Sequence, residues 1–321
     1  QALALSPALV HSTVMVLGFI PLYFAGFLFT AGPKWLGVDP LPVSALRPVL
    51  FLQAGGWLLW LAGAHLGAPL ALAGLLLACV GLGWMTAQFW GRVRLSQAED
   101  QLHARAIATA CVVGSLSAAG VALAMVWDSH ALARVCVFTA LWGFVVVVYV
   151  SVAHRMIPFF TSSAMPMVQA WRPFWVLWLM LGAALLQVLA AWLDWAGVPA
   201  SAAGPAWGVA HGALQLVVGG VLVWLAWVWG LVQSLKNRLL AMLHIGFLWL
   251  GLAFLIGGVS QWLAWGLGMG ALGLGALHAL TMGCLASLML AMVTRVSCGH
   301  SGRALVADRI AWSLFWLLQA A

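Results

Sequence analysis

The stretch LLAMLHIGFLWLGLAFLIGGVSQWLAW, residues 239–265, decides the fold class, because it contains no Asp, Glu, Lys or Arg. A helix of about 20 apolar residues, rising about 1.5 Å per residue, crosses the hydrocarbon core of a bilayer. Nine further apolar segments are bounded by Pro, Gly or charge: 8–31, 48–66, 69–90, 105–126, 132–153, 173–193, 206–233, 271–294 and 308–321. Only the last is too short to span. The sequence therefore predicts an all-α, polytopic transmembrane helix bundle of about ten helices.

The composition excludes a water-soluble protein. Of 321 residues, 65% are hydrophobic and 6% are charged, whereas a soluble domain carries about 25% charged residues. A β-barrel is excluded because the apolar runs do not alternate over about ten residues. The connections are short, so we expect one transmembrane domain over residues 1–321. Because the chain starts without Met and ends inside an apolar run, we expect it to be part of a longer protein.

The positive charges indicate a topology. The net charge is +7, but the cations do not form the basic patch that a nucleic-acid partner would require. Counting the connections between segments from one to nine, only Arg134 lies in or beside an even-numbered one. The other twelve lie in or beside odd-numbered ones: Lys34, Arg47, Arg92, Arg94, Arg105, Arg155, Arg172, Lys236, Arg238, Arg295, Arg303 and Arg309. The positive-inside rule predicts cytoplasmic odd connections, in an inner, energy-transducing type of membrane.

Histidines are the ionisable residues that the spanning segments contain. The six acidic residues all fall in connections, which counts against a transporter built on buried carboxylates. On the predicted topology, three spanning histidines share an outer depth and the fourth lies near the inner boundary. These four are His11, His211, His278 and, on the inner side, His244. Imidazoles at one depth on separate helices suit haem iron or copper; the alternative is that each only hydrogen-bonds a carbonyl.

Other candidate residues lie near the helix ends. We expect His154 to end the fifth helix at the inner level of His244, with His300 nearby. Arg155 and Arg295 lie at predicted inner helix ends, where they could bind haem propionates or lipid phosphates. His65, His103 and His130 are expected to face solvent or headgroups. Cysteines in a CxxC or CxxCH pattern are lacking, so a c-type haem and a zinc knuckle are not expected.

His278 is the strongest single candidate ligand. It lies about two turns into the ninth segment, and we expect it to bind iron or copper with His11 or His211 as its partner. Thr281, about one turn farther along the same helix face, could orient its ring through a hydrogen bond.

Three stretches resemble the NnrS family of bacterial membrane proteins. The first is His11–Gly37, with MVLGFIPLYFAGFLFTAGPKWLG in its second part. The second is RMIPFFTSSAMP (155–166), and the third and most specific is HALTMGCLASLMLAMVTRVSCGHSGRAL (278–305). Many relatives carry His-x-His-Glu where this chain has His11-Ser12-Thr13-Val14, so only His11 matches there. The resemblance marks His11, His244, His278 and His300 as positions of interest.

The resemblance implies a function. The family is described as containing haem and copper and acting in nitric oxide metabolism, and its members are predicted to have about twelve helices. We therefore expect a protein with haem b and copper that binds nitric oxide or another small diatomic ligand. Whether it acts as a nitric oxide reductase-type oxidoreductase, with quinol or another electron donor, is open. The alternatives are a bis-histidine cytochrome b and a transporter of metal or haem.

Overall fold

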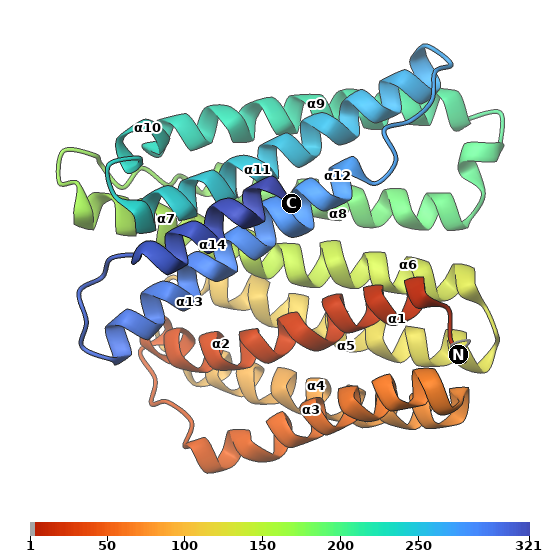
Figure 1. Cartoon of the computed structure of the whole chain (residues 1–321), viewed down its shortest axis with the longest axis horizontal. Coiled ribbons are helices and arrows are strands. Elements are labelled where there is room, and N and C mark those ends of the chain that lie inside the picture. The colour runs from red at the N-terminus through yellow and green to blue at the C-terminus, as the bar shows by residue number, and fades with distance from the viewer. Residues whose placement is uncertain (1–3) are drawn as a thin grey trace. The chain divides into compact units, whose positions relative to one another are not determined.

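The computed structural model describes residues 4–321, which form helices and connecting turns without any strand (Figure 1). Nine helical segments in this range are long and apolar enough to cross a membrane. They are α1–η1–α2 (Pro7–Thr13, Val14–Phe19, Ile20–Leu36), α3 (Val43–Leu66), α4 (Ala68–Leu95), α5 (Leu102–Val126), α6–η2–α7 (His130–Ala140, Leu141–Val146, Val147–Ala164), α8 (Phe174–Trp195), α9 (Gly204–Val228), α11–η4 (Arg238–Gln261, Trp262–Gly266) and α12–η5–α13 (Gly275–His278, Ala279–Ala286, Ser287–His300). Three shorter helices are η3 (Val198–Ala200), α10 (Leu231–Ser234) and α14 (Arg309–Ala320). The predicted all-α polytopic bundle is confirmed.

One predicted boundary is wrong. The fifth segment was expected to end at residue 153, with Arg155 in the connection that follows, but α7 continues to Ala164. Pro158 usually would mark a helix end, because proline lacks the N–H that the helix interior uses. Here it lies inside α7. His154 and Arg155 are therefore helix-interior residues, and the connection runs over residues 165–173.

The chain divides into two compact units, each described by itself below. Unit 1 consists of Gln1–Ser151 and Ala184–Ala196, and unit 2 of Val152–Ala183 and Gly197–Ala321. Helices α7 and α8 each contribute residues to both units. The single domain expected over residues 1–321 stays a prediction.

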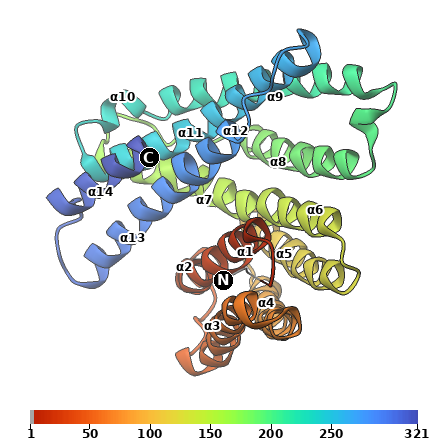
Figure 2. The same ribbon diagram turned by 45° about the vertical axis from the view of Figure 1, so that its right-hand side comes forward.

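Unit 1 is organised around a close pair of helices, α3 and α4, which lie side by side in Figures 1 and 2. Glycines face the partner helix along this contact. A Cβ added at Gly63 would fall 2.1 Å from the backbone nitrogen of Ala71, and one at Gly74 would fall 2.5 Å from that of Trp60. Small residues let membrane helices approach at backbone distance, where dispersion forces and not a hydrophobic driving force hold them together.

Unit 2 contains a second pair of helices, α9 and α11, that pack closely through glycines. A Cβ at Gly219 would fall 2.8 Å from the carbonyl oxygen of Gly251, and one at Gly258 would fall 2.8 Å from that of Gly212. On another part of α11, Gly246 packs against α13. Helix α11, which carries the opening sequence stretch, therefore has neighbours on two sides. This explains why much of its length is buried.

The odd-numbered connections of unit 1 lie at one end. Ser96, just after α4, donates its hydroxyl proton to the carbonyl oxygen of Leu36, at the end of α2, over 2.6 Å. Connections one and three are thus neighbours. We call the end of each unit that carries its odd-numbered connections the cationic end.

Unit 2 has the same arrangement. The indole nitrogen of Trp229 donates to the carbonyl oxygen of Trp171 over 2.9 Å, which joins connections five and seven. The Arg238 guanidinium lies 5.9 Å from the ring centre of Trp312, which joins connections seven and nine. In both units, the cations that the sequence assigned to odd connections therefore gather at one end. Their location in the cytoplasm stays a prediction.

Candidate functional site

The candidate site is built around His244, on α11 of unit 2. Its side chain has 0% exposure, although the residue lies less than two turns from the start of the helix at Arg238. Nε2 of the imidazole lies 2.8 Å from the hydroxyl oxygen of Thr161, near the end of α7. A buried polar contact between two helices thus fixes the ring at the cationic end of unit 2.

The hydrogen bonds of Thr161 assign the proton on this ring. Its hydroxyl oxygen also lies 2.8 Å from the carbonyl oxygen of Ile157, one turn earlier on α7. A carbonyl oxygen only accepts, so the hydroxyl donates its single proton to Ile157 and accepts from Nε2–H of His244. In a neutral imidazole Nδ1 then keeps its lone pair. Among residues 4–321, this buried Nδ1 has no hydrogen-bond partner.

Aromatic side chains lie between α11, the helix that carries His244, and a second buried histidine, His154. Phe247, almost one turn after His244 on α11, lies 4.8 Å from Trp229 between ring centres. Trp229 in turn lies 6.3 Å from the ring of His154. Nε2 of His154 donates to the carbonyl oxygen of Pro173 over 3.1 Å. Unit 2 therefore contains two fully buried imidazoles, and Trp229 lies between the ring of His154 and that of Phe247 on α11.

These histidines do not share one level, as the sequence interpretation expected. His244 is level with Thr161, which lies seven residues beyond His154 on α7. At about 1.5 Å per residue, the two levels differ by about 10 Å. His300, the last residue of α13, is exposed. Of the three predicted inner histidines, His154 and His244 are buried and His300 is exposed.

The two predicted propionate-binding arginines differ in their surroundings. The Arg295 guanidinium, on α13, lies 3.7 Å from the ring centre of Phe160, the residue before Thr161. Arg295 is therefore adjacent to the His244 site. Arg155 is half-buried inside α7, one residue after His154. A positive charge thus accompanies each of the two buried imidazoles.

His278 offers the opposite ring nitrogen. Its Nδ1 lies 3.0 Å from the carbonyl oxygen of Leu274, one turn earlier. Nδ1 therefore carries the proton, and the lone pair is on Nε2 of an exposed side chain. The described residues show no hydrogen bond between Thr281 and this ring; the Thr281 hydroxyl donates to the carbonyl oxygen of Leu277 over 2.9 Å. The orienting group is the backbone of the same helix.

His211, on α9, is occupied by its own neighbours. The amide nitrogen of Gln215 lies 2.9 Å from Nε2 of His211, and an amide N–H only donates, so Nε2 accepts. The ring also stacks on Trp207, with centres 5.2 Å apart and an interplanar angle of 7°. His211 would have to release Gln215 before Nε2 could bind a metal.

The three histidines expected at the outer depth belong to different units. His11 is exposed and belongs to unit 1, whereas His211 and His278 belong to unit 2. Across residues 4–321, no three His, Cys, Asp or Glu side chains gather in a way that could hold a metal ion. A pair of ligands, or one ligand completed by a thioether, stays possible, and so the pairing of His278 with His11 or His211 stays a prediction.

Wide helical turns follow two of these histidines. The π-helix η1 begins three residues after His11, and η5 begins directly after His278. Each contains a glycine against the face of an indole: a Cβ at Gly18 would fall 2.9 Å from Trp57, and one at Gly283 would fall 2.6 Å from Trp249. π-turns within α-helices are frequent at functional sites, because they shift the side chains around them.

The donor atoms fit two different groups. Nδ1 of His244 is buried with no exposed ring surface, so it suits a small ion and leaves no face on which a macrocycle could stack. Copper is well matched to neutral imidazole. The His278 side chain is exposed and its Nδ1–H is held by a backbone carbonyl, which leaves Nε2 as the ligand atom and suits an axial ligand of haem iron. Each histidine would supply one ligand atom to such a group, and the remaining ligands would have to come from elsewhere.

Sequence reasoning missed Thr161, which holds the His244 ring. It occurs in the quoted stretch RMIPFFTSSAMP, but that stretch was interpreted as a connection. Continuing the helix through Pro158 would have placed Thr161 seven residues, or two turns, after His154 on one face. His103 was also misjudged: it was expected to be solvated or headgroup-facing, yet it is 2% exposed in the first turn of α5. His65 and His130 are exposed, as predicted.

Comparison with known proteins gives one match. A family model described as NnrS protein matches residues 1–321, the whole chain. Neither the curated proteins nor the solved structures contain a match to this chain.

Proposed function

This chain belongs to the NnrS family, and from that membership and the geometry of His244 we propose that it binds copper and haem b and handles nitric oxide. It would do so as a multi-pass protein of the bacterial inner membrane. The unpartnered Nδ1 of His244 is the observation that carries the proposal. A buried polar atom without a partner costs about 1–3 kcal/mol, and metal ligation removes that cost.

His244 is the proposed copper ligand. Thr161 holds the ring from its Nε2 side, so that the lone pair of Nδ1 has a fixed direction. Such a hydrogen bond on the far nitrogen raises ligand basicity and prevents ring rotation. Copper accepts thioether as well as imidazole ligands, and a methionine is available at this height.

The register of α11 and α13 identifies that methionine. Gly246 packs against Leu288, while Gly283 packs against Trp249, so the two helices are antiparallel. His244 then lies at the level of the turn from Leu288 to Met292, and Met292 is buried. We propose Met292 as the second ligand from the chain.

His278 is the proposed haem ligand, with the carbonyl oxygen of Leu274 holding its Nδ1–H. The exposed Nε2 leaves room for a flat macrocycle along the helix surface, in contrast to His244. His211 is the candidate partner within unit 2, once Gln215 releases it. Haem iron and copper, when bound, supply positions at which nitric oxide can coordinate. The chain's own side chains orient the ligands and exclude water.

Nitric oxide suits the surroundings of these histidines. It is small, uncharged and soluble in lipid, so it reaches a site among membrane helices without a polar channel. Phe247, on the helix of His244, and Phe160, the residue before Thr161, are both apolar and buried. Reduction of the gas would be a further step that needs electrons from quinol or another donor; the function proposed for these residues is binding.

The proposal is tested on the purified full chain. Iron and copper are measured per chain, and absorption spectra are recorded before and after nitric oxide is added under anaerobic conditions. We expect copper and haem in the protein and a Soret band that shifts with the gas. A reducible six-coordinate spectrum that ignores the gas would instead identify a bis-histidine cytochrome b. A protein without chromophore would favour a transporter.

A further inference from the structure

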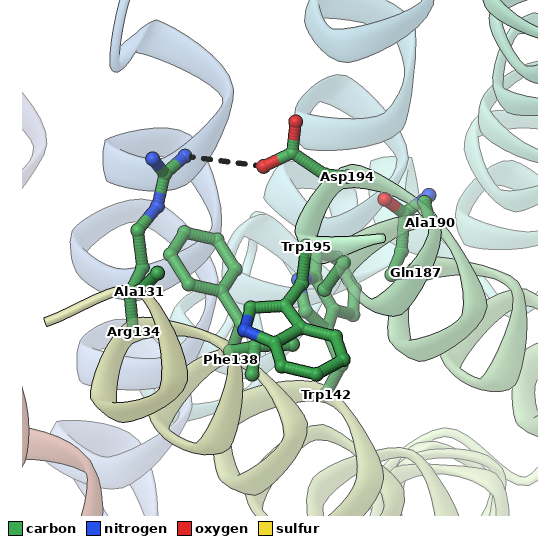
Figure 3. A pocket seen from close by; sticks show the side chains of 10 residues that line it. Ala131, Arg134, Phe138, Trp142, Gln187, Ala190, Asp194 and Trp195 are labelled. Carbon is green, nitrogen blue, oxygen red and sulfur yellow. Dashed lines mark ion pairs between the residues drawn. The ribbon is translucent and has the colours of Figure 1, made fainter. Parts of the chain in front are cut away.

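A cavity of about 280 Å³ lies in unit 1, between α6 and the last turns of α8 (Figure 3). Its mouth is formed by Arg134 and Asp194, whose charged groups lie 3.8 Å apart. Phe138 and Trp142 follow Arg134 at intervals of four residues, so they line one face of α6–η2. From Arg134 to Trp142 the cavity therefore follows the helix for about 12 Å. It is charged at the mouth and aromatic along its walls.

Stability does not explain the charged mouth. The side chains of Arg134 and Asp194 are 71% and 58% exposed, and an ion pair of that kind contributes about 0–1 kcal/mol. Arg134 is also the one cation of thirteen assigned to an even-numbered connection, which the positive-inside rule disfavours. A cation at that end, opposite to the cationic end, is more readily explained by a ligand.

The deeper part of the cavity contains an unused donor. Gln187 lies on α8, seven residues before Asp194 and about two turns deeper. Its amide nitrogen is buried and has no hydrogen-bond partner within the described residues. Figure 3 shows Gln187 on an earlier turn of α8 than the one that carries Asp194 and Trp195. A ligand that offers a carbonyl oxygen at this depth would satisfy the amide.

We propose that this cavity binds a zwitterionic phospholipid with a phosphoethanolamine headgroup. The phosphate accepts hydrogen bonds from the planar guanidinium of Arg134, which matches phosphate geometry. The ammonium takes the place of that guanidinium beside Asp194 and lies near the aromatic ring of Trp195. An ester carbonyl of the lipid accepts from Gln187, and the acyl chains run along Phe138 and Trp142.

The walls favour a lipid over a free phosphoethanolamine ester. A headgroup alone fills the mouth but leaves Gln187 and the aromatic walls without contacts. The walls are those of membrane helices, and Trp residues at a helix end are typical of the membrane–water interface. The charged pair lies at the mouth, Phe138 about one turn deeper, and Gln187 and Trp142 about two turns deeper. The charges therefore meet the headgroup, and the amide and aromatic rings meet the ester and chain region of a phospholipid.

The test measures lipid binding to the full chain in detergent by native mass spectrometry. The probes are phosphatidylethanolamine, phosphatidylglycerol and soluble glycerophosphoethanolamine. The variants are Arg134→Gln, Asp194→Asn and Gln187→Leu. Arg94→Gln is the matched control, because Arg94 is also exposed in unit 1 and lies over an aromatic ring, Trp90, of its own helix.

We expect the parent and the Arg94→Gln control to prefer phosphatidylethanolamine. Arg134→Gln should weaken the binding of both lipids about tenfold, because it removes one charge-assisted hydrogen bond to the phosphate. Asp194→Asn should abolish the preference for phosphatidylethanolamine over phosphatidylglycerol, while phosphatidylglycerol should bind as it does to the parent. Gln187→Leu should weaken both lipids several-fold. If Arg134→Gln does not fold, Arg134→Lys, which keeps the charge but not the planar fork, should give an intermediate loss.

Two results would overturn the proposal. Equal phosphatidylethanolamine binding by the parent, Arg134→Gln and Arg94→Gln would place the headgroup outside this cavity. Binding of glycerophosphoethanolamine as tight as that of the whole lipid would exclude a membrane lipid as the occupant and assign the mouth to a soluble ester.

Discussion

The Thr161 hydroxyl accepts a hydrogen bond from Nε2–H of His244 over 2.8 Å and donates a hydrogen bond to the carbonyl oxygen of Ile157. This chain of two hydrogen bonds leaves one buried atom unused, Nδ1 of His244. The proposed copper site depends on that relationship, because a ring free to rotate would present either nitrogen. Removing the hydroxyl tests it.

Thr161→Val replaces the hydroxyl by a methyl group of similar size and leaves Nε2–H of His244 without an acceptor. We expect a loss of about 1–3 kcal/mol in stability, measured as a lower apparent Tm in detergent, and a reduced copper content. Thr161→Ser, which keeps the hydroxyl, is the control and should retain both. Parent-like copper in Thr161→Val would mean that the ring is held by packing alone.

His278→Ala removes the proposed axial ligand of haem. Because the side chain is exposed and, within the described residues, its ring hydrogen-bonds only the backbone one turn earlier, we expect the protein to stay folded in the membrane. Its Soret band should be lost or altered, as recorded on purified protein. His130→Ala, at an exposed position in unit 1, should leave the spectrum unchanged. If His278→Ala keeps the spectrum, the iron and the copper of the parent, His278 is not the haem ligand.

The orientation in the membrane can be tested by labelling single cysteines in whole cells, in a Cys298→Ser background. An impermeant maleimide should not label cysteines replacing Gln97 or Lys236, in connections three and seven at the cationic ends. It should label a cysteine replacing Ala200, which is exposed in connection six. Labelling at both Gln97 and Lys236 positions, without labelling at Ala200, would invert the topology.

Apolar runs and charge placement predicted most of the fold. All nine spanning segments were identified, because a segment long enough to cross a membrane and lacking charge has few other structures open to it. The end of α7 was not predicted correctly. A proline such as Pro158 is interpreted as a helix boundary unless tertiary contacts are known to support the helix beyond it. The gathering of cations at one end of each unit also agrees with the pattern read from the sequence.

The candidate site could be predicted only in part. Sequence placed His244 and His278 on spanning helices, because a histidine inside an apolar run is conspicuous. Helix α12 begins at Gly275, however, so His278 lies in the first turn and not about two turns in. The sequence could not say which ring nitrogen is available. That depends on Thr161 for one histidine and on the carbonyl oxygen of Leu274 for the other. Nor could it show that Gln215 occupies Nε2 of His211, since these contacts are fixed by side-chain positions.

The central claim is that His244 binds copper, and copper content per chain tests it most directly. His244→Leu fills the same buried space without a ligand atom, and His65→Leu, at an exposed position, controls for the loss of any histidine. Both proteins are purified in parallel with the parent, and copper, iron and apparent Tm are measured. The account predicts that His244→Leu loses copper while it keeps its haem spectrum and its fold, and that His65→Leu matches the parent. A folded His244→Leu protein with the full copper content of the parent would contradict it.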